Sequence, residues 1–223
     1  MKKSVLASAV LAISFFVETQ GFSLYDLWRP YSPAKMVKEP RKLAVDVIGL
    51  FEEKPQKEKF ALDLGAGAGH DTAYFIKNGW RVWANDEEKE SINFMANRDD
   101  IRPYKNNVTL MQKSFLDLPW DTFPQFNLIY ASFSLPFVTR HNFDKIWSHV
   151  ENALSSGGIF AGTFFGPDHG VFSWWVNWRM TFLTKQACLD LFKNFTVLRF
   201  EEYHENNDEG CMEHVFTVVA RKN

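Results

Sequence analysis

The alternation of apolar and polar positions predicts a repeating order of strands and helices from residue 40 onward. Short apolar runs of the kind found in buried strands occupy residues 60–64, 81–86, 108–115, 126–133 and 159–165. Helical patterns occupy residues 40–51, 68–77, 87–97 and 143–154. Thr184 is a suitable N-cap for a further helix that ends at Lys193. The pattern therefore predicts strands that alternate with helices.

The C-terminal end of the chain breaks this alternation. Residues 195–205 and 213–222 are two predicted strands with no helix between them. We therefore predict an α/β fold: a doubly wound, Rossmann-like sheet of seven mostly parallel strands that closes with a C-terminal antiparallel hairpin. The continuous apolar strands fit parallel strands that are covered on both faces.

The N-terminus carries a different pattern. Two lysines precede an apolar run over residues 4–17, and Gly21 offers a cleavage position, which together are typical of a secretory signal peptide. The run is too short to predict a stable membrane span. An apolar N-terminal helix is the alternative. We expect three parts, namely a signal-like or apolar segment at 1–21, an irregular arm at 22–39 and one folded domain at 40–223.

Composition narrows the classes of partner. The formal net charge of the 223-residue chain is −2 and no run of Lys or Arg occurs, so we expect no nucleic-acid partner. The 22 Phe and 8 Trp residues favour a thick core or an apolar pocket. Cys188 and Cys211 form no CxxC motif, and the His residues show no metal-ligand spacing, so we expect no metal site.

The segment ALDLGAGAGHDTAYF, residues 61–75, joins the first predicted strand to the helix that follows it. In a doubly wound sheet the first strand normally lies at the switch point, where ligands bind beyond the carboxyl ends of the strands. Gly65, Gly67 and Gly69 allow positive φ and a close approach of the backbone to a bound molecule. Three glycines at alternate positions exceed what a turn requires, so we expect this loop, with Ala66, to bind a ligand.

The spacing of the loop indicates the ligand. A dinucleotide fingerprint is GxGxxG, whereas the third glycine here comes one residue early. A carboxylate at Asp63 suits a cationic amino group better than a pyrophosphate, because like charges repel. Asp86 ends the second strand, where a carboxylate can accept hydrogen bonds from both hydroxyls of a ribose. These features predict a cationic nucleoside, and S-adenosylmethionine fits that description.

Five segments in this order resemble the class I S-adenosylmethionine-dependent methyltransferases: LDLGAGAG, VWAND, KSFLDLPW, FNLIYASFSLPF and LSSGGIFAGTFFG. The C-terminal part, from MTFLTKQACLDLF through EHVFTVVARK, is similar to bacterial small-molecule methyltransferases of the tellurite-resistance type. The resemblance implies methyl transfer to a small-molecule acceptor, with S-adenosylmethionine as cofactor. It also implies that Asp63, Gly65 and Gly67 line the methionine moiety, and Asp86 the ribose.

The resemblance implies further contacts with the cofactor. Ser114 and Phe115 would flank the adenine, at a place where the family often has an acidic residue. Asp117 either replaces that acid or caps a turn. Ala131 and Phe133 would lie nearest the transferring methyl group.

The acceptor side of the site is less well specified. Methyl transfer is an in-line displacement with a neutral thioether leaving group, so a general base is required only if the acceptor arrives protonated. His141 and His169 are weak candidates for that base. Weak predictions for the acceptor pocket are Tyr31, Arg140, Trp174, Trp175, Trp178 and Arg179. The tryptophans fit a roof over the sheet equally well.

Two other interpretations stay open. A non-catalytic relative, used as an exported binding module, would account for the signal-like segment at 1–21. An NAD(P)-dependent oxidoreductase is less compatible with the loop spacing. The cofactor loop favours the cytoplasm, because S-adenosylmethionine is made there, and we expect a cytoplasmic protein with export as the alternative. The acceptor and the oligomeric state do not follow from the sequence.

Overall fold

The computed structural model describes residues 39–51, 59–170, 179–206 and 212–223. The predicted segment at 1–21 and almost all of the arm at 22–39 lie outside these ranges, so both stay predictions. Among the described helices, none is long and apolar enough to cross a membrane.

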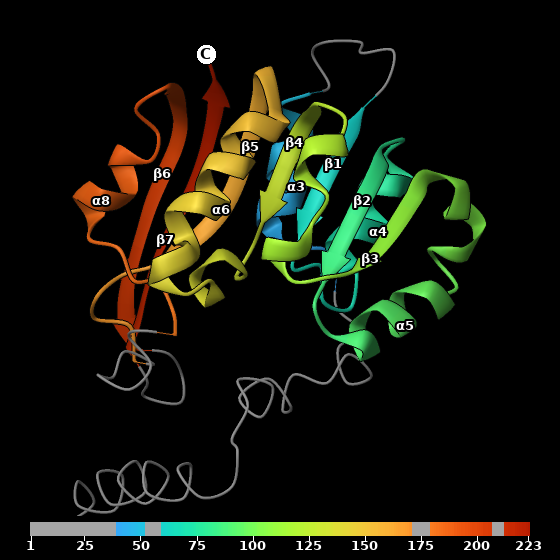
Figure 1. Ribbon diagram of the computed structural model, residues 1–223, viewed down its shortest axis with the longest axis horizontal. Coiled ribbons are helices and arrows are strands. Elements are labelled where there is room, and N and C mark those ends of the chain that lie inside the picture. Colours follow the sequence, from blue (N-terminus) through green and yellow to red (C-terminus); the bar gives the residue numbers. More distant parts are fainter. Residues whose placement is uncertain (1–38, 52–58, 171–178, 207–211) are drawn as a thin grey trace, which may run out of the picture. The chain divides into compact units, whose positions relative to one another are not determined.

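Seven strands form one sheet in the order β3-β2-β1-β4-β5-β7-β6 (Figure 1). Pairing is parallel from β3 through to β5, whereas β7 runs antiparallel to both β5 and β6. The predicted fold class is therefore confirmed. The strands are β1 (Phe60–Leu64), β2 (Arg81–Asp86), β3 (Val108–Gln112), β4 (Phe126–Ala131), β5 (Leu154–Phe165), β6 (Phe195–Asn206) and β7 (Met212–Lys222).

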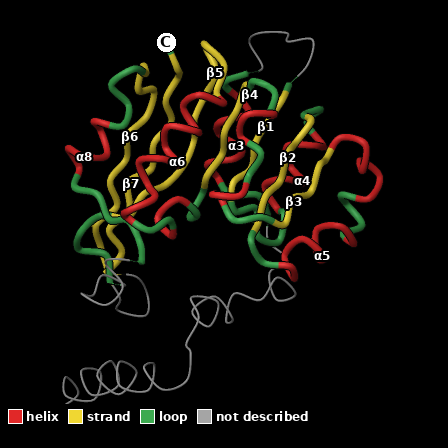
Figure 2. Tube along the Cα trace, viewed as in Figure 1, coloured by secondary structure: helices red, strands yellow, loops and turns green. Residues whose placement is uncertain are grey.

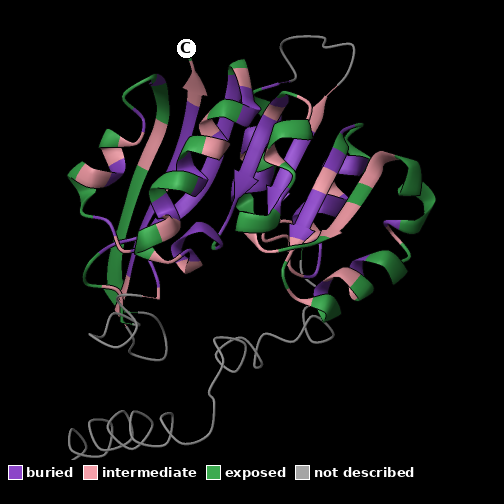
Figure 3. Ribbon diagram, in the orientation of Figure 1, coloured by how far each residue is buried: buried purple, intermediate pink, exposed green. Residues whose placement is uncertain are grey.

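Helices cover both faces of this sheet (Figure 2). One apolar cluster joins strand residues to α6 and α8, and a second joins the opposite face to α3, α4 and α5. The central strands are accordingly buried on both sides, whereas β6 at the edge is mostly exposed (Figure 3). The helices are α3 (Lys42–Gly49), α4 (His70–Lys77), α5 (Lys89–Asn97), α6 (Arg140–Ala153) and α8 (Lys185–Asp190). Short 3-10 turns are η3 (Arg102–Asn107), η4 (Phe115–Asp117), η5 (Trp120–Thr122) and η6 (Leu135–Phe137).

Element boundaries differ from the predicted ones where local backbone conformation intervenes. The helix predicted from residue 68 begins at His70, because Gly69 before it is left-handed with φ 73°. The helix predicted from residue 87 begins at Lys89, because Glu88 is extended. Leu154 belongs to β5 and not to the preceding helix. The predicted cap at Thr184 is confirmed, since its hydroxyl oxygen accepts a hydrogen bond from the amide of Ala187 at 3.2 Å.

Candidate functional site

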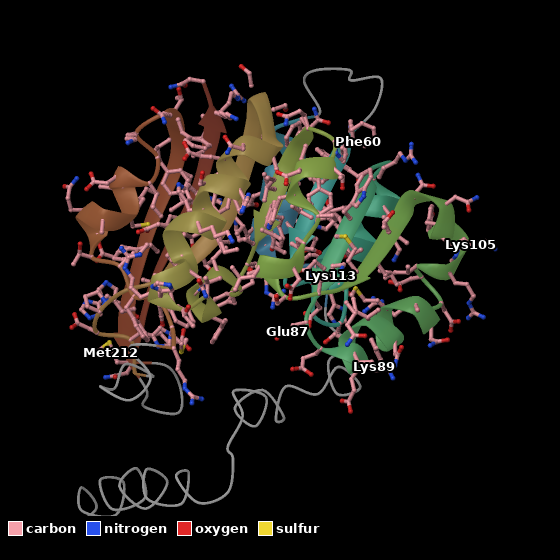
Figure 4. All side chains as sticks on the ribbon, viewed as in Figure 1. Phe60, Glu87, Lys89, Lys105, Lys113 and Met212 are labelled. Atoms are coloured by element: carbon pink, nitrogen blue, oxygen red, sulfur yellow. The ribbon has the colours of Figure 1, made fainter. Side chains whose placement is uncertain are left out.

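The glycine loop lies at the switch point of the sheet. From β1 the chain continues outward through β2 and β3, then returns to β4 on the other side of β1. Loops after β1 and β4 therefore diverge at this point, where doubly wound sheets bind ligands. Figure 4 labels Glu87, Lys113 and Met212 along the edge where β2 and β3 end and β7 begins, with Phe60 at the opposite edge. The ends of β2 and β3 and the start of β7 thus share one edge.

All three loop glycines adopt the left-handed conformation that side chains disfavour. The φ angles of Gly65, Gly67 and Gly69 are 72°, 54° and 73°. A Cβ on Gly65 would lie 2.4 Å from the Cβ of Ser134, so packing also requires glycine there. A Cβ on Gly67, in contrast, would meet no described atom within 4 Å. Gly67 therefore borders open space, as a residue beside a bound ligand must.

Asp86 fixes this loop through its carboxylate. Its Oδ2 accepts a hydrogen bond from the amide of Gly67 at 2.8 Å, and its Oδ1 accepts one from the amide of Glu88 at 2.9 Å. Burial raises the pKa of Asp86, and these two hydrogen bonds, together with one from the Ser91 side chain, oppose that shift. A carboxylate has about four acceptor sites, so these three donors leave room for about one more. The geometry suits a hydroxyl of a ligand placed beside the loop.

Asp63 lies beneath the loop and not on its surface. The residue is 2% exposed, and one carboxylate oxygen accepts a hydrogen bond from the hydroxyl of Thr72 at 2.5 Å. Burial, together with the charge of nearby Asp71, raises the pKa of Asp63 to about 7. A cationic group in front of the loop would compensate this buried carboxylate. The position fits the predicted role of holding a ligand through the loop.

A buried network next to Asp63 went unpredicted. Asp71 Oδ1 accepts a hydrogen bond from the Arg41 amide at 2.7 Å, and Oδ2 accepts from the Arg41 guanidinium at 2.9 Å and the Tyr130 hydroxyl at 3.0 Å. Asp71 thereby joins the start of α4 to β4 and to the residue before α3. An acid in the first turn of a helix is a readable signal, because it complements the helix dipole. Its partners, 30 and 59 residues away, are not readable from the sequence.

The segment after β4 faces the loop. Phe133 is the non-glycine residue with positive φ among those described, at 53°, and its amide donates to the Thr163 hydroxyl at 2.7 Å. Its side chain is 43% exposed, whereas Ala131 is fully buried in the core. The Ser134 hydroxyl is buried and has no hydrogen-bond partner among the described residues, although it lies beside Gly65. Ser134 is therefore a site candidate that the sequence analysis missed.

The predicted adenine contacts lie just past β3. The Ser114 hydroxyl donates to a carboxylate oxygen of Asp117 at 2.6 Å, and Ser114 precedes the turn η4. Asp117 lies in the turn η4, and both predicted roles of its carboxylate stay predictions. Phe115 is partly buried and packs against the core cluster that includes Leu118. The turn brings both predicted residues to the carboxyl edge of the sheet.

The acceptor-side predictions fall partly inside and partly outside the described residues. His169 stacks on Phe165, with ring centroids 3.9 Å apart, and burial lowers its pKa. His141 is exposed on α6, where Arg140 forms an ion pair with Asp144 at 2.9 Å. Arg179 is half-buried. The remaining predicted residues lie outside the described ranges: Tyr31, Trp174, Trp175 and Trp178.

An aromatic patch connects His169 with the segment after β4. The Phe165 ring lies 6.3 Å from the Phe133 ring and 5.7 Å from the Phe137 ring, measured between centroids. Burial lowers the pKa of His169, which makes its imidazole a weaker base. The Phe165 ring lies between this predicted histidine and Phe133.

Residues 61–158 match a family model described as a methyltransferase domain. A search of curated proteins gave no match. One similar solved structure is TehB from Haemophilus influenzae, with a TM-score of 0.64 and 17% identity over 81% of this chain, which spans 61% of the TehB chain.

Two further structures are similar along most of their length. The 1,6-didemethyltoxoflavin-N1-methyltransferase of Burkholderia thailandensis, solved with 1,6-didemethyltoxoflavin and S-adenosylhomocysteine, has a TM-score of 0.61 and 19% identity over 97% of this chain and 89% of its own. The N-methyltransferase NodS from Bradyrhizobium japonicum WM9, solved with S-adenosylhomocysteine, has a TM-score of 0.61 and 13% identity over 86% of this chain and 92% of its own. At such identities these likenesses concern the fold. Residues 61–158 are thus similar to a methyltransferase domain, and the chain shares the fold of these three methyltransferase structures.

Proposed function

We propose that the protein transfers the methyl group of S-adenosylmethionine to a small-molecule acceptor by in-line displacement. One observation carries the proposal: Asp86 holds the amide of Gly67 at 2.8 Å while the space in front of Gly67 is open. Two of the similar solved structures contain S-adenosylhomocysteine, the demethylated form of this cofactor. A carboxylate and a glycine backbone at a switch point form a suitable seat for the ribose and the methionine chain.

Different residues of this chain are proposed to bind different parts of the cofactor. The Asp86 carboxylate would accept a hydrogen bond from the ribose, and the glycine backbone at Gly65 and Gly67 would contact the methionine part. Asp63 compensates the positive amino group from below the loop, where its carboxylate is buried. The Ser134 hydroxyl, which has no partner among the described residues, lies beside Gly65 and is available to the same ligand.

The cofactor, when bound, supplies a methyl group activated by attachment to a sulfonium. The protein then has to hold the acceptor in line with that methyl, and such positioning lowers a barrier by up to roughly 7–11 kcal/mol. The half-exposed ring of Phe133 offers a π face to the cationic centre. His169, joined to Phe133 through the Phe165 ring, is the candidate base for acceptors that arrive protonated.

A small-molecule acceptor agrees with the charge of the protein. The formal net charge is −2, and a nucleic-acid substrate would require a basic surface. Aromatic side chains at Phe133, Phe137 and Phe165 form an apolar patch at the carboxyl edge of the sheet. Methyl transfer from a cytosolic cofactor also favours a cytoplasmic location over export.

The test is calorimetry with S-adenosylhomocysteine on the full chain. Asp86→Ala removes the proposed ribose contact and the hydrogen bond that holds the Gly67 amide, so we expect affinity to fall about 100-fold, equivalent to about 3 kcal/mol. Asp86→Asn keeps one acceptor oxygen for the loop amides and should bind more weakly than wild type by a smaller factor. Asp99→Ala is the matched control, because the Asp99 carboxylate is 91% exposed on the surface.

Two outcomes would overturn the proposal. One is no binding of S-adenosylmethionine or S-adenosylhomocysteine by folded wild-type protein. The other is equal affinity in wild type and Asp86→Ala, because the loop geometry would then have no part in holding the ligand. Binding with an intact Asp86 dependence, but no methyl transfer to any acceptor offered, would point to the non-catalytic alternative.

A further inference from the structure

A second group of chemically active side chains gathers away from the glycine loop. Asp168 lies in the turn after β5, His204 near the end of β6 and His214 near the start of β7. The register of the hairpin pairs His204 directly with His214, and their rings stack with centroids 4.2 Å apart. One ligand atom from each of the three residues lies within 4.8 Å of the other two.

The spacing of these atoms matches a metal coordination sphere. His204 Nε2 lies 3.3 Å from Asp168 Oδ2, and His214 Nδ1 lies 3.6 Å from the same oxygen. Ligands about 2.0–2.2 Å from a tetrahedral zinc ion are roughly 3.3–3.6 Å apart from one another. Imidazole nitrogens with one carboxylate oxygen are also the ligand types that zinc and related divalent transition metals prefer.

The surroundings of His214 prepare one ring nitrogen for coordination. His214 Nε2 lies 3.1 Å from Glu202 Oε1, so Nε2–H donates to that carboxylate and Nδ1 keeps its lone pair. The other oxygen of Glu202 accepts from Lys185 at 2.8 Å, which holds the carboxylate in place. A carboxylate behind a histidine ligand is the common outer-shell arrangement in zinc sites.

Packing fixes the His214 ring. Its atoms lie only 2.3–2.5 Å from where a Cβ on Gly166 would stand, so glycine is required for the ring to fit. The side chain of His214 is 7% exposed, whereas those of Asp168 and His204 are 61% and 43% exposed. The amide of Asp168 donates to His214 Nδ1 at 3.3 Å, a long hydrogen bond that a cation would replace. One ligand is thus held rigidly, and two are open to solvent.

We propose that Asp168, His204 and His214 form a binding site for a divalent transition-metal ion, with zinc as the favoured ion and Glu202 as the carboxylate that orients His214. Three protein ligands leave the fourth position for water or a ligand oxygen. The site uses none of the residues assigned to the cofactor, so it stands independently of the methyl-transfer proposal. It lies at the same sheet edge as the glycine loop, where β5 ends and β7 begins.

The competing interpretation is an ion-pair cluster, in which protonated histidines face Asp168 and Glu202 with no metal. The two interpretations predict different binding of zinc by the protein.

The test is equilibrium dialysis of metal-free full-length protein against Zn²⁺, with the number of bound zinc ions per chain measured. His204→Ala and Asp168→Asn each delete an exposed ligand, whereas His214→Ala would empty a packed position and put folding at risk. His149→Ala is the matched control, because His149 stacks on Trp120 elsewhere on the molecule.

We expect about one zinc ion per wild-type chain, and the same for His149→Ala. Affinity should fall at least about tenfold in His204→Ala and in Asp168→Asn, and roughly tenfold in Glu202→Gln, which keeps the fold and alters only the orienting carboxylate. Urea denaturation of each variant checks that the rest of the protein is folded. Zinc binding that is absent in wild type, or unchanged in His204→Ala and Asp168→Asn, would overturn the proposal and leave the ion-pair cluster.

Discussion

The donor side and the hairpin side of the sheet differ in how their residues are brought together. On the donor side, the loop from Gly65 to Gly69 follows β1, and Asp86 ends the neighbouring strand β2. Gly67 and Asp86 are 19 residues apart in the sequence. On the hairpin side, Asp168 meets His214 across 46 residues, through a strand pairing that inserts β7 between β5 and β6. Local segments shape the first region, and long-range register shapes the second.

This difference explains what each region reveals about its chemistry. The residue types of the donor loop indicate its role, because glycine at alternate positions has few other uses. His204 and His214 are ten residues apart, and this spacing predicts no shared site. They come together because the hairpin register pairs them directly. Unusual residues at close spacing can be interpreted directly, whereas ordinary residues at long range need the fold.

The largest expected effect separates the roles of two loop glycines. Gly65→Ala places a methyl 2.4 Å from the Ser134 Cβ at φ 72°, so backbone strain and overpacking together should lower the free energy of unfolding by about 2–5 kcal/mol. Gly67→Ala meets no described atom and should cost only about 1–2 kcal/mol, from its φ of 54°. Its methyl enters the open space, so it should weaken cofactor binding more than folding.

Urea denaturation and calorimetry with S-adenosylhomocysteine measure these two quantities. Gly65→Ala should mainly lower the free energy of unfolding, whereas Gly67→Ala should mainly lower the affinity for S-adenosylhomocysteine. Equal losses of stability would mean that the space in front of Gly67 is not open in solution. Full affinity in Gly67→Ala would mean that the ligand does not approach this glycine.

A second prediction concerns the pH dependence of stability. Burial and the charge of Asp71 raise the pKa of Asp63 to about 7 in the folded protein, above its unfolded value of about 3.9. The folded state therefore keeps a proton that the unfolded state has lost, and the free energy of unfolding falls as pH rises from about 4 to about 7. Asp63→Asn, which keeps an oxygen for the Thr72 hydroxyl, should remove most of this slope.

Urea denaturation between pH 5 and about pH 8 measures the slope in wild type and Asp63→Asn. Asp99→Asn serves as control, since the Asp99 carboxylate is 91% exposed and its loss should leave the slope unchanged. Opposite behaviour is expected for the ligand: a cationic amino group binds better above pH 7, where Asp63 is ionised. A wild-type protein whose stability rises from pH 5 to pH 7, with no change in Asp63→Asn, would contradict the raised pKa.

The order of elements could be predicted because each one has a local cause. The limits of β1 and β2 agree with the apolar runs at 60–64 and 81–86, since buried parallel strands are continuous apolar runs. Helix starts could not be predicted to the residue, because they depend on backbone conformations such as the left-handed Gly69. The predicted strand over residues 108–115 is too long, because β3 ends at Gln112 and Phe115 belongs to the turn η4.

The candidate site was predictable to the same extent. Gly65, Gly67 and Asp86 could be named because their types and spacing reflect what they contact. Ser134 and Asp71 could not be named from the sequence. Ser134 is a candidate because its buried hydroxyl has no partner among the described residues, and Asp71 because it accepts hydrogen bonds from Arg41 and Tyr130. Such contacts arise only when β4, α3 and α4 are packed together.

The smallest expected effect lies at Phe133, between the two regions. Its φ of 53° is strained for any residue with a side chain, and its ring is 43% exposed, so the ring contributes little burial. Phe133→Gly removes the ring and the strain together, whereas Phe133→Ala removes the ring and keeps the strain. Glycine gains about 1–2 kcal/mol from relief at positive φ and loses about 0.5–1 kcal/mol through the freedom of its unfolded chain. The free energy of unfolding of Phe133→Gly, measured by urea denaturation, should therefore be about 1 kcal/mol higher than that of Phe133→Ala. The reverse order would show that Phe133 relaxes out of the left-handed conformation in solution, which would argue against the proposed position of its ring beside the transferring methyl.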